Sequence, residues 1–174
     1  LDVRLLLQSA RHNRRKPPVI ALLASPLRLD HGRLDLDLRE RLGGDLAYLR
    51  EGTNLTYVAG GQMVARALAA SDELATEGVS AGVINMSTIK PIDTEALVKA
   101  ARSGAGIITL EEHSVIGGLG EATAAVVAEH APTMVLRIGV EDTFGESGKP
   151  EELMEKYGLG LSTIVERTRR FLAV

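Results

Sequence analysis

The chain has 174 residues, 45% of them hydrophobic and 25% charged, which is enough for one globular domain of ordinary size and argues against disorder. Its net charge of -3 gives no general attraction to nucleic acid or anionic membranes, and the absence of cysteine excludes disulfides, thiolate metal sites and a cysteine nucleophile. No apolar run approaches the roughly 20 residues that a membrane-spanning helix needs. We therefore expect a soluble, cytoplasmic protein.

The first 44 residues are typical of an incomplete unit. The chain starts at Leu1 without the pattern of a signal peptide, and we interpret this start as a processed or trimmed boundary. A short helix is predicted to end at the basic run of residues 14–16, where cations complement the helix dipole; a phosphate or nucleic-acid patch is the weaker alternative. After Pro17 and Pro18, residues 19–24 are predicted to form a fully buried strand. One helix and one strand cannot form a sheet alone, so we interpret residues 1–44 as the remnant of a preceding domain plus a linker.

From residue 45 onward, strands and helices alternate regularly, and residues 45–174 are expected to form the main domain. Strands are predicted over residues 46–49, 55–59, 81–86, 106–110 and 134–138. Helices are predicted over residues 62–77, 93–101, 121–129 and 150–157, and from a cap at Ser162 or Thr163 to the end of the chain. This alternation predicts a three-layer α/β/α sandwich with a mostly parallel five-stranded sheet. The first strand follows a tight turn and is expected to be the one antiparallel strand.

Ligands of open α/β sheets bind beyond the carboxyl ends of the strands. Three segments are expected there: residues 60–62, residues 85–91 and residues 111–120. The first needs small residues for a tight turn but also offers backbone amides to an anion. The second is polar and contains no visible pair of nucleophile and base.

The third segment carries the most chemistry, because Glu112 and His113 leave a buried strand just before a glycine-rich loop. A carboxylate that orients a histidine favours proton transfer, so these two residues are candidates near an active-site entrance. The backbone amides of Gly117, Gly118 and Gly120 form a candidate anion loop. In the alternative, which we favour for the domain alone, the glutamates cap loops or pair at an interface and the glycines let the helix approach the sheet.

No metal site is expected, since no two histidines show the spacing of metal ligands on a helix. The candidate site therefore depends on carboxylates, one imidazole and backbone amides.

Three runs of sequence resemble the carboxyl-terminal domain of transketolase. They are Ile-Asn-Met-Ser-Thr-Ile-Lys-Pro-Ile-Asp at residues 84–93, Thr-Leu-Glu-Glu-His-Ser-Val-Ile-Gly-Gly-Leu-Gly-Glu-Ala at residues 109–122, and Gly-Val-Glu-Asp-Thr-Phe-Gly-Glu-Ser-Gly-Lys-Pro-Glu-Glu-Leu at residues 139–153. Together these three runs are far more specific than one glycine motif. Their sequences are most similar to those of the carboxyl-terminal subunits of split, two-gene transketolases.

The resemblance implies a part of an enzyme that transfers a two-carbon ketol unit between sugar phosphates on thiamine diphosphate and magnesium. It implies that residues 1–44 are a remnant of the pyrimidine-binding domain plus a linker, and that residues 45–174 are the transketolase C-terminal domain. It also implies that the remaining diphosphate- and pyrimidine-binding domains are partners, that the assembly is a homo-oligomer, and that this chain alone is inactive and binds no cofactor. Many members carry a substrate-phosphate arginine where this chain has residues 23–26, Leu-Ala-Ser-Pro. Similar domains occur in 1-deoxyxylulose-5-phosphate synthases and the beta subunits of 2-oxoacid dehydrogenases. A non-catalytic module that binds a small anion is the remaining alternative.

Overall fold

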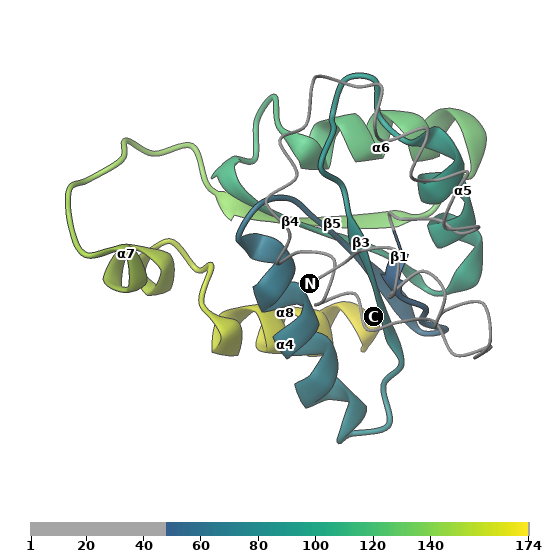
Figure 1. The fold of residues 1–174 in the computed structure, drawn as a ribbon, viewed down its shortest axis with the longest axis horizontal. Helices are drawn as coiled ribbons and strands as arrows, with labels where there is room; N and C mark the ends of the chain where they lie inside the picture. The colour runs from purple at the N-terminus through teal and green to yellow at the C-terminus, as the bar shows by residue number, and fades with distance from the viewer. Residues whose placement is uncertain (1–47, 174) are drawn as a thin grey trace, which may run out of the picture. The chain divides into compact units, whose positions relative to one another are not determined.

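The computed structural model describes residues 48–173 (Figure 1). The helix and strand predicted within residues 1–24, and the remnant assigned to residues 1–44, lie outside the described residues and stay predictions. The strands are β1 (Tyr48–Arg50), β2 (Leu55–Ala59), β3 (Ala81–Asn85), β4 (Gly106–Ser114) and β5 (Met134–Val140). The helices are α4 (Met63–Ala75), α5 (Thr94–Ser103), α6 (Leu119–His130), α7 (Pro150–Lys156) and α8 (Leu161–Leu172).

The five strands form one sheet in the order β1-β3-β2-β4-β5. Strands β2 to β5 pair in parallel, and β1 pairs with β3 antiparallel, which confirms the prediction of one antiparallel strand. The chain places β3 on one side of β2 and then β4 on the other. This change of direction creates a switch point between β2 and β4, where open α/β sheets hold their ligands.

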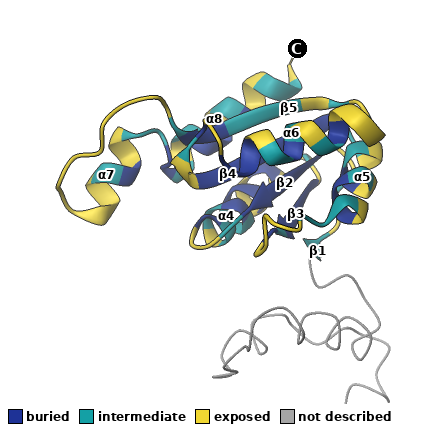
Figure 2. Cartoon of the chain, turned by 90° about the horizontal axis from the view of Figure 1, so that it is seen from above, coloured by how far each residue is buried: buried dark blue, intermediate teal, exposed yellow. Residues whose placement is uncertain are grey.

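Helices α4 and α8 cover one face of the sheet and α5 and α6 cover the other, which confirms the three-layer sandwich (Figures 1 and 2). The residues of β2 alternate between the two faces, as a pleated strand requires. Tyr57 belongs to the core beneath α4 and α8, together with Leu74 and Ile164. Val58 belongs to the opposite core with Leu97, so both faces of this central strand are buried.

Two glycines allow β1 and β3 to pair closely. A Cβ atom at Gly52 would lie 1.9 Å from the backbone nitrogen of Gly82, and a Cβ atom at Gly82 would lie 3.0 Å from the nitrogen of Gly52. No side chain fits between these two backbones. The turn that joins β1 to β2 therefore depends on glycine at position 52.

Strand β4 is longer than predicted, which changes the setting of the candidate residues. The sequence predicted its end at Leu110, but the strand continues to Ser114 because β5 also continues, and Ser114 pairs with Val140 after an irregularity in the register. The amide of Val115 also donates to the carbonyl oxygen of Val140, at 2.9 Å. Glu112 and His113 are therefore strand residues, not loop residues.

The two predicted helix caps had different outcomes. Asp93 caps α5 as predicted, since its carboxylate accepts from the amide of Ala96 at 3.1 Å. The prediction that Ser162 or Thr163 caps the last helix is wrong, because α8 begins at Leu161 after Gly160 and has no side-chain cap. Leu161 packs against the core, and this contact starts the helix earlier than the hydroxyl side chains indicated. None of the described helices is long and apolar enough to cross a membrane.

Candidate functional site at the switch point

The carboxylate of Glu111 holds the start of helix α6. Its side chain is buried with 6% of its surface exposed, and its two oxygens accept from the amides of Leu119 and Gly120 at 2.7 and 2.8 Å. A carboxylate is favoured at a helix amino end because it satisfies free N–H groups and complements the helix dipole. The anion at this helix start is therefore supplied by the strand that precedes the helix.

The three glycines of the candidate anion loop lie around this carboxylate. Gly117 has a φ of 75°, a left-handed conformation that favours glycine. A Cβ atom at Gly118 would lie 2.0 Å from a carboxylate oxygen of Glu111, and one at Gly120 would lie 2.9 Å from the hydroxyl of Thr109. Gly118 and Gly120 let the loop approach strand β4 closely, whereas Gly117 serves the turn before them. An external anion at the Gly120 amide would have to displace Glu111.

Glu112 lies at the switch point itself. Its carboxylate accepts a hydrogen bond from the side-chain amide of Gln62, which follows β2. Since β2 and β4 are neighbours in the sheet, this pair joins the segment that follows β2 to the last part of β4. Sequence analysis placed both segments at this edge but did not pair these residues, because the pair depends on strand order.

His113 is exposed at the same edge. Its Nδ1 atom lies 2.9 Å from the carbonyl oxygen of Ser114, and Glu112 turns to Gln62 instead of to the imidazole. The structure thus brings Glu112, His113 and Gln62 to one edge, but it contains no carboxylate–imidazole pair among them. This arrangement offers an accessible imidazole and polar hydrogen-bonding groups to a neighbouring surface.

Arg137 of β5 fixes the loop behind the site, and sequence analysis missed it. Its guanidinium donates to the carbonyl oxygen of Val115 at 2.9 Å and lies 3.4 Å from the carboxylate of Glu121. The backbone of Arg137 in turn accepts from Arg167 of α8 at 3.1 Å. The sequence signal for this role was a single arginine among the apolar residues of the strand Met134–Val140.

Residues 44–164 match the family model described as the transketolase C-terminal domain. The chain belongs to this family. The match confirms the resemblance that the three sequence runs indicated.

The relatives of this transketolase C-terminal domain are longer proteins. A 6-deoxy-6-sulfo-D-fructose transketolase subunit of Clostridium sp. strain MSTE9 is 43% identical over 149 residues, covering 86% of this chain and 45% of the relative. A 1-deoxy-D-xylulose-5-phosphate synthase of Neisseria gonorrhoeae is 41% identical over 124 residues, covering 71% of this chain and 19% of the relative. A solved split gene transketolase, described as an inactive beta4 tetramer, is 48% identical with a TM-score of 0.69 and covers 72% of this chain and 41% of its own. The chain therefore spans less than half the length of these relatives.

Two features of residues 48–173 count against a site for the thiamine diphosphate and magnesium that the family resemblance implies. A magnesium diphosphate needs carboxylate or carbonyl oxygens on the metal and free N–H groups on the phosphates. Residues 48–173 contain no group of three or more His, Asp or Glu side chains that could hold a metal ion. The helix start at the switch point already has Glu111 on its amides.

Proposed function

We propose that this domain is the carboxyl-terminal part of a transketolase-type transferase, which moves a two-carbon ketol unit between sugar phosphates. The family match supports this proposal, together with 43% identity to a transketolase subunit and 48% identity to a split gene transketolase. Thiamine diphosphate and magnesium would be held by the diphosphate- and pyrimidine-binding domains, in the same assembly. The role of this domain is then architectural: it supports those domains and presents the His113 edge to them.

The observation that carries the architectural role is the Glu111 carboxylate on the amides of Leu119 and Gly120. At the position where related α/β sheets bind an anionic ligand, this domain carries its own anion. The same observation counts against the alternative of a module that binds a small anion at this helix start.

A reconstitution experiment tests the proposal. The chain is mixed with a transketolase fragment that carries both the diphosphate- and the pyrimidine-binding domain, together with thiamine diphosphate and magnesium. Ketol transfer is then measured from a ketose phosphate and from 6-deoxy-6-sulfofructose to an aldose phosphate. We expect activity only in the mixture, and no binding of thiamine diphosphate to the chain alone by calorimetry. Micromolar, magnesium-dependent binding to the isolated chain would contradict the architectural role.

A 1-deoxy-D-xylulose-5-phosphate synthase is the second candidate, since one such enzyme is 41% identical to this chain. The same mixture supplied with pyruvate and glyceraldehyde 3-phosphate distinguishes the two. Release of carbon dioxide without ketol transfer would favour the synthase.

A further inference from the structure

Strand β5 forms a long free edge of the sheet. It is last in the strand order and pairs only with β4. The opposite edge strand, β1, has three residues, whereas β5 has seven. A long edge strand is a template on which another chain can add a strand, and proteins protect such edges with charged side chains or covering elements. We therefore expect a protecting group at the edge of β5.

The sequence of β5 favours the addition of a strand. Its residues, Met-Val-Leu-Arg-Ile-Gly-Val, include no proline and no acidic residue, and Arg137 is the one charged residue among them. Segments of this length with high β propensity and low net charge are typical of cross-β assembly. The start of the strand is accessible, since the side chain of Met134 is 52% exposed.

The backbone of Arg137 faces the free edge. The carbonyl oxygen of Val140 accepts from the amide of Val115, and a Cβ atom at Gly106 would lie 2.6 Å from the carbonyl oxygen of Met134. Both of these oxygens therefore point toward β4. Successive residues of a strand direct their backbone groups to opposite sides, and Arg137 lies three residues from each end of this pattern. Its amide and carbonyl groups consequently point away from β4.

The guanidinium of Arg167 binds this outward carbonyl oxygen. It reaches over from helix α8 and donates from Nη2 at 3.1 Å. Arg167 is half-buried and forms no ion pair with another described residue, whereas Arg169 and Arg170 on the same helix both pair with glutamates. The charge of Arg167 is therefore directed to the edge of the sheet.

We propose that Arg167 shields the free edge of β5 against the addition of a strand from another polypeptide. A strand that pairs with β5 lies about 4.8 Å from it and donates an amide to the carbonyl oxygen of Arg137. The guanidinium already occupies that position and places a positive charge on it. A second strand would have to displace the guanidinium, so the contact keeps the edge closed.

The shield acts on assembly more than on stability. One hydrogen bond at a half-exposed position contributes little to the free energy of unfolding, because water replaces it when it breaks. The loss of Arg167 should therefore appear in the rate of cross-β assembly, with a melting temperature close to that of the wild type. This inference goes beyond the proposed function, because the contact includes neither Glu112, His113 nor the start of α6.

Assembly kinetics of the full chain test the proposal. The wild type and each variant are shaken at equal concentration, each at the same interval below its own melting temperature, and fibril formation is followed by thioflavin T fluorescence. We expect Arg167→Ala to shorten the lag several-fold, and its product to show the infrared band of intermolecular β-sheet. Arg167→Lys keeps a cation and a donor at the edge, so its lag should stay close to that of the wild type.

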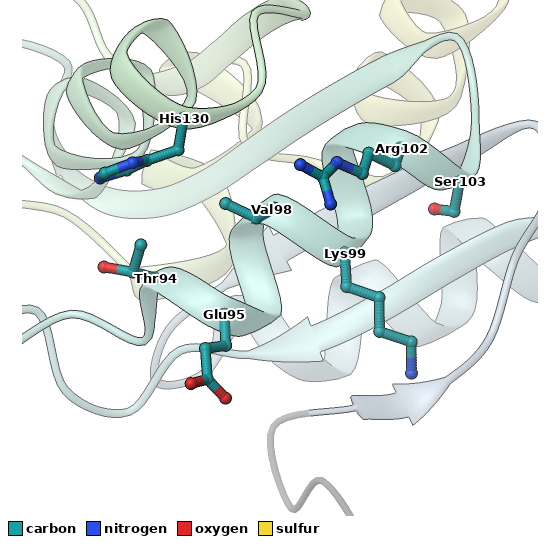
Figure 3. A pocket seen from close by; sticks show the side chains of 7 residues that line it. All are labelled: Thr94, Glu95, Val98, Lys99, Arg102, Ser103 and His130. Carbon is teal, nitrogen blue, oxygen red and sulfur yellow. The ribbon is translucent and has the colours of Figure 1, made fainter.

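Two other arginines provide matched controls, because their variants lose the same charge. Arg170→Ala acts on the same helix but removes an ion pair with Glu166. Arg102→Ala removes an arginine that, like Arg167, forms no ion pair with another described residue. Arg102 lines an open groove of about 600 Å³ along α5, beside Val98, and is not at the edge of the sheet (Figure 3). Both variants should keep the lag of the wild type.

A second change at the edge makes the test specific for β5. Met134→Lys places a cation at the exposed start of the strand, so its addition to Arg167→Ala should restore the lag of the wild type. Three results would overturn the proposal. They are equal lags for Arg167→Ala and Arg170→Ala, an Arg167→Ala product without intermolecular β-sheet, and a double variant that assembles as fast as Arg167→Ala.

Discussion

The hydroxyl of Tyr57 lies 2.6 Å from the hydroxyl of Thr168, in a buried hydrogen bond between the central strand β2 and the last helix α8. Thr168 donates its own proton to the carbonyl oxygen of Ile164 at 2.8 Å, so Tyr57 is the donor to Thr168. Burial raises the pKa of Tyr57 from 10.0 to about 12, although the bond to Thr168 lowers it. This bond fixes α8 on the sheet over a sequence separation of 111 residues.

Tyr57→Phe removes this bond and leaves the Thr168 oxygen without its donor. We expect the free energy of unfolding to fall by about 1 kcal/mol at neutral pH, the usual size for one buried hydrogen bond. Denaturant titration measures the change, and Thr168→Val with the double variant completes a double-mutant cycle. Additive effects in that cycle would show that the two hydroxyls do not interact.

We also expect Tyr57 to make the protein less stable at high pH. The pKa of Tyr57 is raised in the folded state. Its contribution to the free energy of unfolding is therefore complete below pH 10.0, where tyrosine in the unfolded chain is still protonated, and is lost as the pH rises toward about 12. The stability of the wild type should therefore fall more steeply above pH 10.0 than that of Tyr57→Phe, by at most about 1.4 kcal/mol per pH unit. Denaturant titrations at matched pH values compare the slopes. Equal slopes would mean that Tyr57 is accessible to ionisation in the native state.

Glu111→Gln keeps the shape of the side chain but removes its charge and one of its acceptors. Because the amides of Leu119 and Gly120 then lose an ionised partner inside the protein, we expect a loss of about 2 kcal/mol in the free energy of unfolding. Glu112→Gln is the control, since that carboxylate is exposed, and its effect should stay within about 0.5 kcal/mol. Similar stabilities of the two variants would refute a structural role for Glu111.

Gly52→Ala tests the close approach of two backbones. The new methyl group would lie 1.9 Å from the nitrogen of Gly82, so β1 must separate from β3 or the domain must unfold. We expect a loss of more than about 3 kcal/mol, as for severe overpacking. Gly145→Ala is the control, because a Cβ atom there meets no atom within 4 Å. A Gly52 variant as stable as the wild type would show that β1 is not required.

A chain without residues 1–42 should fold cooperatively. All five strands and both helical layers lie within residues 48–172, so the two cores remain complete after the deletion. Differential scanning calorimetry should show one sharp transition. A broad or absent transition would mean that the preceding residues belong to the folding unit.

His113→Ala should leave stability unchanged, because the side chain is exposed and bonds to its own neighbour, Ser114. If the His113 edge faces the other transketolase domains, the variant should lower the activity of the reconstituted mixture. Ile89→Ala, in the loop after β3, is the comparison for a nearby change at the same edge of the sheet. Full activity of the His113 variant would remove this residue from the site.

The fold was predictable because its signals are local. Glycines and Asp93 mark the ends of the elements, and apolar runs such as residues 55–59 mark strands buried on both faces. The family resemblance rested on local runs as well. The length of β4 was not predictable, because residues 111–114 are polar and continue the strand only where β5 offers partners.

The site was predictable as a location and not as a set of contacts. Sequence analysis brought Gln62 and Glu112 to one edge of the sheet, but their hydrogen bond requires β2 and β4 to be neighbours. The bond from Gly120 to Glu111 depends on a chain reversal that the glycines permit.

The carboxylate of Glu111 can be regarded as a ligand that is covalently attached to its receptor. A ligand held in the correct orientation has an effective concentration far above the millimolar range of free phosphate or carboxylate metabolites. We therefore expect soluble anions at such levels not to displace it, so that the start of α6 does not respond to the metabolic state of the cell. In other sheets the corresponding helix start binds a soluble anion reversibly. Here the Glu111 carboxylate always occupies the start of α6, so this part of the switch point has a fixed shape and no binding equilibrium.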